Sequence, residues 1–578
     1  IYARRDLREF ELDRYVANEL DHFVPSGLSE PMPRDIVTTE TCNGRCHDPL
    51  AIHGGSRQEV GLCILCHNPF QDIDPDTGNS VDMPLMVHKI HYGAELTKGY
   101  NIIGYMQSNH DYSNVVYPAE PNECESCHTG GTPTANFPMV ATPSAVLVCD
   151  ASGKGMTTLS WEHTGDVAIY VRSETNPDGK LFATGNKTGS VDTGTWVRDG
   201  AEFDIYDFKS MELLQTVAVD ATAHGCVGNA PGTARGVAGT QHTNWLDNPT
   251  RKTCGSCHDY IDWETGEGHS DFNYPQSSDE LCDKCHEATG KEFGRSVAGA
   301  HQLLYKSAQL PNVFVEFVDI TDTDPGDTPT VTFKLQGKNG PIDPNDMNRL
   351  RFVLSGPNAD WDFYEDETVG DAAVSAGENL WSYTFETALP DDAEGSYTVS
   401  MEGRIEVPVD MGGEVDDERD YAENPMMAFA VTDTTAAPRR TVVSDEKCES
   451  CHLNLSLHGG NRHDVTYCST CHMPNAVDIA TPAESIQMKW MIHKIHRGEE
   501  LENGYIVVRN RGTYDFSDYV FTGDLRNCDA CHVNNSQQLP QSEGLLPTIT
   551  NNAWWTPMEP QAAACLSCHD DDNSAAHA

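Results

Sequence analysis

Nine short motifs that end in Cys-His recur along the 578-residue chain. Eight have the form C-x-x-C-H, and the ninth, from Cys42 to His47, has one extra residue between its cysteines. In such motifs the two cysteines form thioethers with a haem, and the histidine that follows becomes the proximal iron ligand. Zinc ribbons and thioredoxin-like pairs also contain C-x-x-C, but neither needs a histidine after the second cysteine every time. The nine motifs therefore predict a multihaem c-type cytochrome.

The motifs supply two sets of predicted haem-binding residues. The cysteines predicted to attach nine haems c are Cys42, Cys46, Cys63, Cys66, Cys124, Cys127, Cys254, Cys257, Cys282, Cys285, Cys448, Cys451, Cys468, Cys471, Cys528, Cys531, Cys565 and Cys568. The histidines predicted as proximal ligands are His47, His67, His128, His258, His286, His452, His472, His532 and His569. Haem attachment at the motif from Cys42 to His47 requires that the extra residue between its two cysteines is tolerated.

The composition agrees with bound porphyrins. Only 38% of the residues are hydrophobic, and 47 Gly and 32 Pro are present, which is lean for a protein core of this size. The motifs use 18 of the 20 cysteines and leave Cys149 and Cys226. Because thioether attachment implies export to an oxidising compartment, we expect these two to form a disulfide, with two free thiols as the alternative.

The formal net charge is −51. Such a surface repels nucleic acid and anionic membranes and suits an exposed extracellular protein. The start of the chain, Ile1 to Arg5, lacks the apolar segment of a signal peptide, and no apolar run approaches the length that crosses a bilayer. We therefore expect an exported, mature chain that is soluble or peripheral, with an upstream lipid anchor left open.

One acidic segment resembles a calcium loop. Asp72, Asp74, Asp76 and Asp82 have alternating carboxylates, as a calcium site would need. Gly78 is misplaced for an EF-hand, however, so the calcium site is an expectation beside the ordinary solvated loop.

A duplication organises the chain. The two copies are 405 residues apart, and "LAIHGGSRQEVGLCILCHNP" answers "LSLHGGNRHDVTYCSTCHMP", while "MVHKIHYGAEL" answers "MIHKIHRGEEL". Repetition of one unit with its own ligands predicts an array of stacked cofactors. The histidines that recur are His47, His53, His67, His88 and His91, which match His452, His458, His472, His493 and His496.

Two β-rich segments separate the haem motifs. Residues 143–238 contain short alternating runs such as "TGDVAIYVRS", which predict an inserted immunoglobulin-like β-sandwich. Residues 306–438 contain "PTVTFKLQG" and "GSYTVSMEG" and predict a central antiparallel β domain. The expected architecture is therefore multidomain, with multihaem modules of loops and short helices alternating with antiparallel β-sandwich or Greek-key domains. The first haem module is predicted to consist of residues 42–142 and 239–305 and to bind five haems. The second module is predicted at residues 439–578, with four haems. Residues 1–41 are interpreted as the remnant of an upstream β domain.

Nine haems with both axial positions filled need nine distal ligands. Fifteen histidines lie outside the motifs, and the repeat and their positions after the motifs select nine of them. The predicted distal ligands are His53, His88, His91, His269, His301, His458, His493, His496 and His577. Methionine is the alternative distal ligand, but the 16 methionines show no matching repeat. The other histidines are expected to be structural or exposed: His22, His110, His163, His224, His242 and His463.

The H-K-I-H segments place two distal candidates three residues apart, on one face of a helix. We expect one short helix to serve two adjacent haems and hold them close together, as electron transfer needs.

Together, the paired "HGG…CxxCH…HKIH" modules, the "CGSCHDYIDWETGEGH" stretch and the β domain between the modules resemble the OmcA/MtrC family of decahaem outer-membrane cytochromes. The resemblance covers essentially the whole chain. It implies a cell-surface protein, exported through the periplasm, that passes electrons to metal oxides, flavins, humic material or electrodes. It also implies other multihaem cytochromes or an outer-membrane porin–cytochrome conduit as partners. This chain departs from the family in having nine motifs, an inserted β segment and only part of an N-terminal β domain.

Three functions remain open from the sequence. An electron conduit along fully ligated haems is favoured, with no catalytic residues. A subunit of a polymeric cytochrome filament, formed by self-association, is the first alternative. A reductase of a small inorganic substrate is the second, but it would need an open iron site, and the distal candidates suffice to fill all nine. Because the second module stops at its fourth distal candidate, we also expect the chain to be part of a ten-haem design.

Overall fold

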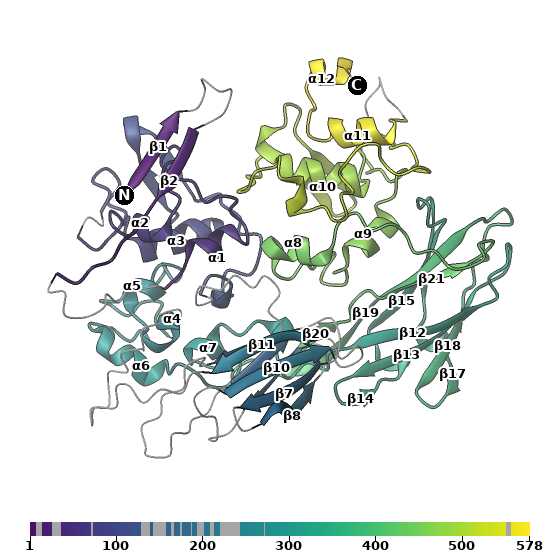
Figure 1. Ribbon diagram of the computed structural model, residues 1–578, viewed down its shortest axis with the longest axis horizontal. Coiled ribbons are helices and arrows are strands. Elements are labelled where there is room, and N and C mark those ends of the chain that lie inside the picture. Colours follow the sequence, from purple (N-terminus) through teal and green to yellow (C-terminus); the bar gives the residue numbers. More distant parts are fainter. Residues whose placement is uncertain are drawn as a thin grey trace. The chain divides into compact units, whose positions relative to one another are not determined.

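The computed structural model separates into two compact units, Ile1–Gly131 with Thr240–Ala578 and Thr132–Gly239 (Figure 1). It describes residues 1–6, 14–25, 36–70, 73–128, 139–142, 158–162, 167–173, 176–185, 188–192, 201–207, 213–219, 243–270, 272–550 and 557–577.

The smaller unit contains two antiparallel sheets. One has the order β5-β6-β9 and the other β11-β10-β7-β8. Leu159, Ile169, Phe203 and Ile205 are buried, as the alternating sequence requires of inward-facing strand positions. The strands are β5 (Met139–Thr142), β6 (Thr158–Glu162), β7 (Val167–Ser173), β8 (Asn176–Gly185), β9 (Thr188–Asp192), β10 (Ala201–Asp207) and β11 (Leu213–Val219). Cys149, Cys226, His163 and His224 lie outside the described residues, so the predicted disulfide stays a prediction.

The central β domain of the larger unit consists of two five-stranded antiparallel sheets. The first follows the order β12-β13-β18-β17, with β14 beside β13; the second follows β16-β15-β19-β20, with β21 beside β19. The first contains β12 (Phe314–Thr321), β13 (Thr330–Gly337), β14 (Gly340–Pro341), β17 (Val374–Gly377) and β18 (Leu380–Thr384). The second contains β15 (Arg349–Gly356), β16 (Phe363–Thr368), β19 (Ser396–Asp410), β20 (Val415–Tyr421) and β21 (Met426–Ala430).

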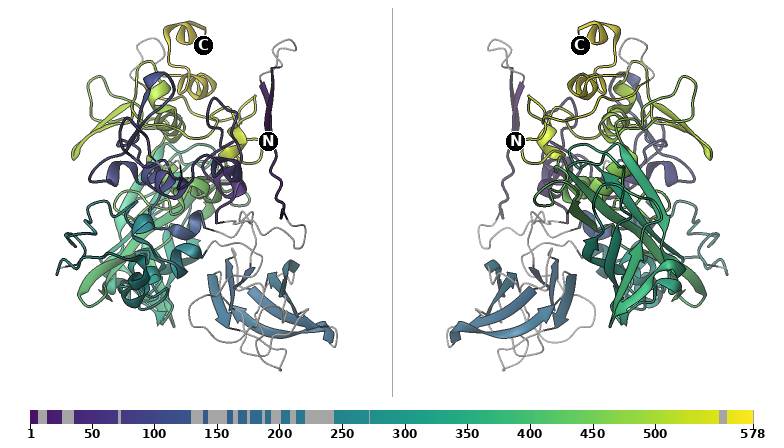
Figure 2. Two further views of the ribbon diagram at one scale, coloured as in Figure 1. Left: turned by 90° about the vertical axis from the view of Figure 1, so that its left-hand side faces the viewer. Right: turned by 90° about the vertical axis from the view of Figure 1, so that its right-hand side faces the viewer.

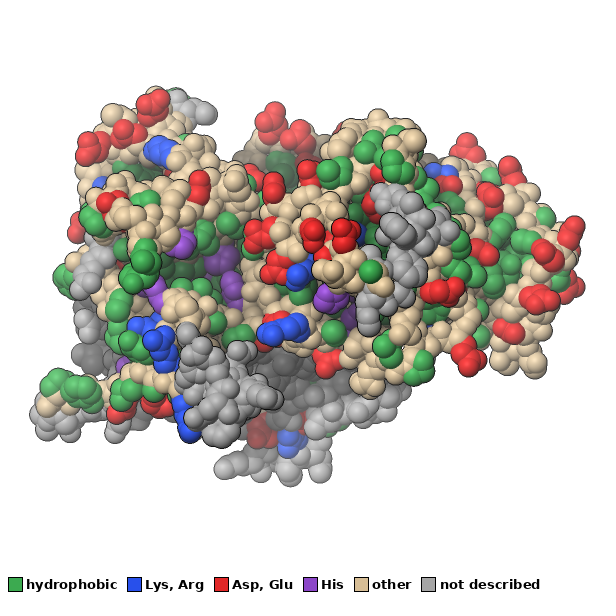
Figure 3. All heavy atoms as spheres, turned by 90° about the horizontal axis from the view of Figure 1, so that it is seen from above, with side chains coloured by type: hydrophobic (Ala, Val, Ile, Leu, Met, Phe, Trp, Pro, Cys, Tyr) green, Lys and Arg blue, Asp and Glu red, His purple; other side chains and the backbone are tan. Residues whose placement is uncertain are grey.

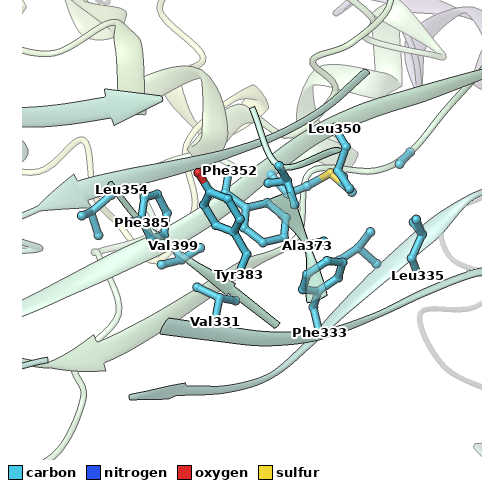
Figure 4. Packing of buried hydrophobic residues seen from close by; sticks show 14 of the residues in the cluster. Val331, Phe333, Leu335, Leu350, Phe352, Leu354, Ala373, Tyr383, Phe385 and Val399 are labelled. Carbon is cyan, nitrogen blue, oxygen red and sulfur yellow. The ribbon is translucent and has the colours of Figure 1, made fainter. Parts of the chain in front are cut away.

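The core of this domain lies between the two sheets (Figure 4). On β13 the alternate residues Val331, Phe333 and Leu335 are buried, which is the period of two that the sequence shows. Phe333 and Phe352 meet edge to face with ring centroids 4.9 Å apart, across the two sheets. Burial of each such side chain stabilises the domain by about 1.5–3 kcal/mol.

The two haem modules are built from short helices and long connections (Figure 2). The first contains α1 (Thr39–Asn43), α2 (Val60–Cys63), α3 (Met83–Tyr92), α4 (Asn244–Asp247), α5 (Arg251–Cys254), α6 (Cys282–Cys285), α7 (Val297–Ala300) and the hairpin β3 (Asn101–Ile103)–β4 (Asn109–Asp111). The second contains α8 (Asp445–His452), α9 (Val465–Cys471), α10 (Met488–Arg497), α11 (Pro560–Leu566), α12 (Asp572–His577) and the hairpin β22 (Ile506–Arg509)–β23 (Gly512–Asp515). No described helix is long and apolar enough to cross a membrane.

The sequence repeat is also a structural repeat. The two H-K-I-H segments form α3 and α10, as predicted, and each is followed by a small hairpin. His53 and its counterpart His458 both have a left-handed backbone, with φ of 53° and 54°. A left-handed conformation is unfavourable for a residue with a side chain, so its recurrence at both sites indicates a constrained functional position.

Each module is held by an asparagine from a neighbouring β element. The Oδ1 atom of Asn424, next to β21, accepts a hydrogen bond from the backbone N–H of His463 (2.7 Å), and its Nδ2 donates to the carbonyl of Asn461 (3.0 Å). In the hairpin β1 (Tyr2–Asp6)–β2 (Arg14–Asn18), Asn18 makes the equivalent bonds to Gln58 and Ser56, the counterparts of His463 and Asn461. The assignment of residues 1–41 to an upstream β domain stays a prediction, as do the other domain boundaries.

Candidate haem-binding sites

The structure brings eight of the nine motif histidines opposite eight different distal candidates. In every pair one ring comes from a motif and the other from the distal set, and the ring centroids are 6.0–6.2 Å apart. The pairs are His47–His91, His67–His53, His128–His88, His258–His301, His286–His269, His452–His496, His472–His458 and His532–His493.

This separation suits one metal ion between two imidazoles. A metal–imidazole nitrogen bond is about 2.0–2.1 Å, and the nitrogen lies roughly 1 Å from the ring centre, so two ligands on opposite sides of one ion have centroids about 6 Å apart. Ordinary packing of two aromatic rings can also give this distance. The strict pairing of a motif ring with a distal ring, eight times over, favours axial ligation.

The ninth motif is only partly defined. His569 follows α11, which carries Cys565, as the other motif histidines follow their cysteines. Its predicted distal partner, His577, is the last residue of α12, and its side chain lies outside the described residues.

Helices α3 and α10 each contribute distal candidates to two sites. On α3, His88 faces His128 while His91 faces His47. On α10, His493 faces His532 while His496 faces His452. Residues three apart lie on neighbouring parts of one helical face, so each short helix fixes the spacing of two sites.

Hydrogen bonds at Nδ1 hold most of the paired rings in place. The Nδ1 atom is bonded in eleven of the paired histidines, mostly to a backbone carbonyl, for example His67 to Val81 (2.8 Å) and His472 to Ile486 (2.6 Å). An Nδ1–H that donates to a carbonyl leaves Nε2 free to bind a metal. The eleven are His67, His91, His258, His269, His286, His301, His452, His472, His493, His496 and His532.

Burial keeps several of these imidazoles neutral. It lowers the pKa of His88, His472 and His493 to about 4, with nearby histidines adding to the effect. A neutral imidazole is the form that binds iron, so these sites need no deprotonation at neutral pH.

None of the 18 motif cysteines forms a disulfide, so each sulfur is available for thioether attachment. Burial raises the pKa of Cys124 and Cys448 to about 12. Within the described part of the chain, no group of three or more His, Cys, Asp or Glu is arranged to hold a metal ion.

The apolar surface also fits haem. None of the ten residues of α3 is fully buried, although the helix includes Met83, Leu85, Met86, Val87 and Ile90. A protein of this size normally covers such side chains, and the flat faces of porphyrins would cover them here. On the face drawn in Figure 3, histidine side chains are visible in the hollowed part of the surface, next to apolar side chains.

The first motifs of the two modules meet. The Nδ1 of His452 lies 3.1 Å from the carbonyl oxygen of Pro118 in the first module. Reciprocally, the hydroxyl of Thr522, the counterpart of Pro118, donates to the carbonyl of Cys46 (2.9 Å). The modules therefore contact each other through equivalent segments, with a candidate haem site on each side.

The remaining histidines make other contacts. His110 is exposed and lies 3.0 Å from the hydroxyl of Ser108, and His463 packs beside the ring of Tyr421. His22 is exposed, while His242 lies outside the described residues. The exclusion of these histidines from the ligand set stays a prediction.

In the acidic segment before α3, the carboxylates of Asp74 and Asp82 bind groups of the protein itself. Asp74 is buried and accepts hydrogen bonds from Thr77, Asp76 and the backbone of Ile103. Asp82 is paired with Lys252 at 2.6 Å. Asp72 lies outside the described residues, and the calcium site stays a prediction without a described ligand cage.

Comparison with known proteins agrees with this geometry. The family model for outer membrane cytochrome MtrC/MtrF-like proteins, domains II/IV, matches twice, at residues 34–158 and 440–578, which are the two copies of the repeat. The two haem modules therefore belong to the MtrC/MtrF-like domain II/IV family of outer membrane cytochromes. Membership implies covalently attached haem c, and the paired cysteines of this chain are consistent with it.

Individual relatives are distant. The multihaem cytochrome MtrC of Shewanella baltica (strain OS185) is 26% identical over 232 residues, which cover 36% of this chain and 31% of that protein. The crystal structure of MtrC from the same organism superposes with a TM-score of 0.56 at 16% identity, covering 98% of this chain and 73% of MtrC. The crystal structure of the outer membrane decahaem cytochrome OmcA gives 0.57 at 19% identity, covering 97% of this chain and 72% of OmcA. The two structures share the fold of this chain.

Proposed function

We propose that this protein is an extracellular electron conduit whose nine haems each have two histidine ligands. The eight pairings of a motif histidine with a distal histidine support the proposal best. The haem, when bound, supplies one-electron exchange at its iron. If the motif histidine and the facing histidine of each pair both held the iron, no position would remain open for a substrate, and this favours electron transfer over reduction of a small molecule.

The polypeptide spaces and orients the sites. Helices α3 and α10 each fix two neighbouring sites, and backbone carbonyls hold the imidazole rings in one tautomer. The contact of His452 with Pro118 joins the first module to the second. These contacts support a continuous electron-transfer path through both modules.

We further propose that the electrons come from partner multihaem cytochromes or a porin–cytochrome conduit of the outer membrane. The acceptor at the cell surface would be a metal oxide, flavin, humic compound, electrode or another cytochrome. The match to the family model and the strongly acidic composition support these electron donors and acceptors at the cell surface. An acidic surface disfavours nucleic acid as a partner.

Low-temperature EPR of the oxidised, haem-loaded protein tests the ligation. We expect only low-spin ferric signals, and a stoichiometric high-spin signal would refute the proposal and favour a reductase. His91→Met should raise the potential of one haem in a redox titration, because a thioether ligand favours ferrous iron. His110→Met, an exposed histidine outside the pairs, is the matched control. Equal titration curves for His91→Met and the unchanged protein would exclude His91 as a ligand.

A further inference from the structure

A half-buried group of basic side chains lies between the central β domain and the second module. Arg439 and Arg440 precede α8, and Lys489 lies in the first turn of α10. The guanidinium groups of Arg439 and Arg440 contact the same oxygen of Asp360, at 2.9 and 3.1 Å. We call Arg439, Arg440 and Lys489 the basic cluster.

Asp360 is the one carboxylate that these three cations share among the described residues. Its second oxygen accepts a hydrogen bond from the backbone of Leu546 at 3.0 Å. Lys489 is within electrostatic reach of Asp360 and of both arginines, and its ammonium group donates to the carbonyl of Pro560 at 3.0 Å. Asp362 is exposed, and burial raises its pKa, the opposite of what pairing with a cation would do. Asp360 balances one of the three positive charges of the basic cluster, so two of the three remain unbalanced.

Excess positive charge in a buried place is unfavourable without an anionic partner. The side chain of Arg439 is 13% exposed, lies 4.7 Å above the ring of Trp361, and has a buried Nε without a hydrogen-bond partner. Burial lowers the pKa of Arg439 to about 10 and that of Lys489 to about 8. The cluster is therefore prepared for an anion of two charges.

The neighbourhood identifies which haem could provide that anion. Lys489 precedes His493 by one helical turn and acts electrostatically on its ring. The segment that begins with Arg439 and Arg440 continues to Val443, which forms a β-bridge with His532. His493 and His532 are the facing pair of one site, with ring centroids 6.1 Å apart. The basic cluster therefore lies beside both histidines of this site.

We propose that the basic cluster binds the two propionates of the haem attached at Cys528 and Cys531. This inference rests on the proposed function, since it requires the haem between His493 and His532. The two propionate charges match the two unbalanced cations, and arginine is well suited to pair with carboxylates.

The first module lacks the complete cluster. The counterpart of Lys489, 405 residues earlier, is Pro84, which carries no charge. The haem at Cys124 and Cys127, which occupies the equivalent place in the repeat, is therefore without this cation. Because a positive charge favours ferrous over ferric iron, the haem at Cys528 should have the higher potential of the two.

The test uses voltammetry of the complete haem-loaded protein adsorbed on an electrode, with Lys489→Gln, Lys489→Arg and Asp360→Asn. Lys489→Gln should lower the reduction potential of one haem by an amount on the order of 59 mV. For a one-electron couple, this shift corresponds to a tenfold change in the ratio of oxidised to reduced haem. Lys489→Arg should retain the original value, and Asp360→Asn should shift the same haem upward. Lys334→Gln, which removes one surface charge on β13, is the matched control and should shift none.

A crystal structure of the loaded protein decides the contact itself. Propionate oxygens within hydrogen-bond distance of at least two of the three basic groups would support the proposal. Propionates directed to solvent, or a potential that Lys489→Gln and Asp360→Asn leave unchanged, would overturn it. If a variant lost haem, the pyridine haemochrome count would reveal it, and the structure of the unchanged protein would still decide the contact. Failure of the ligation itself would appear beforehand, as high-spin EPR signals of the unchanged protein.

Discussion

Substitution of Glu402 by Gln should strongly destabilise the contact between the central β domain and the second module. Glu402 lies on β19 and its side chain is 2% exposed. Its two oxygens bind Arg349 on β15 and Arg462, which lies four residues after the distal candidate His458. Tyr467 on α9 also donates to it, at 3.2 Å. One carboxylate therefore joins a β strand to the residues that hold one haem site.

Removal of this carboxylate leaves two largely buried guanidinium groups without an anion. Breaking a buried ion pair by removing one partner costs about 3–5 kcal/mol. Since 1 kcal/mol changes the melting temperature of a unit of 150–250 residues by about 2–4 °C, we expect Glu402→Gln to lower it by roughly 10 °C. Differential scanning calorimetry of the haem-loaded protein measures the shift.

Glu406 on the same strand is the matched control. It also pairs with arginines, at 3.1 Å to Arg419 and 3.8 Å to Arg404, but its side chain is 34% exposed. Exposed pairs contribute about 0–1 kcal/mol, so Glu406→Gln should lower the melting temperature by no more than about 3 °C. Equal shifts for the two variants would refute the reasoning that burial, and not pairing alone, determines the contribution.

The pH dependence gives a second check on Glu402. Burial opposes its ionisation, but the hydrogen bonds from Arg462 and Arg349 outweigh burial and hold its pKa below the usual value. A carboxylate with a lowered pKa stabilises the folded state fully above its unfolded pKa of about 4.3, and this contribution is lost as the pH falls through the folded pKa. The difference in stability between the unchanged protein and Glu402→Gln should therefore be constant near neutral pH and shrink below about pH 4.

Two further predictions concern other parts of the chain. Gly459→Ala should lower the folding stability by about 1 kcal/mol, because Gly459 has a left-handed backbone (φ +72°). Gly460→Ala should lower it by roughly 2–3 kcal/mol, because the added methyl group would lie 2.4 Å from the ring of Tyr421. Comparable melting temperatures for the two variants would contradict this difference. Cys149 and Cys226 should be disulfide-bonded, so the intact mass should not change on alkylation without reductant, and uptake of two alkyl groups would exclude the bond.

The repeat made the architecture largely predictable. Histidine spacing alone identified α3 and α10 as helices, and alternating residues identified the β domains. The pairing of individual histidines could not be read from the sequence. His88 and His128 are 40 residues apart in the chain, and only the path of the intervening hairpin brings them together. Which histidine rings face each other is thus a property of the tertiary fold, since every distal candidate has the same local chemistry.

Other features were missed because they have no signal in a motif. The partner of the His452 ring is a backbone carbonyl, that of Pro118, and any residue type supplies a carbonyl. Glu402 lies on a strand of the β domain, where charged residues are usually exposed, and the basic cluster is assembled around Asp360 of the same domain. A comparison of the two repeats would have revealed Lys489, because Pro84 replaces it in an otherwise similar segment.

The duplicated modules meet through equivalent segments, and some contacts within one module recur in the other. Tyr117 packs against the edge of His91 at 5.7 Å, and its counterpart Phe521 packs against His496 at 5.6 Å. Identical surroundings would give equivalent haems equal potentials and no preferred direction for electrons between them. A direction must therefore come from positions at which the copies differ. Lys489, which stands where the first module has Pro84, is such a position: its charge would make the haem at Cys528 easier to reduce than the one at Cys124.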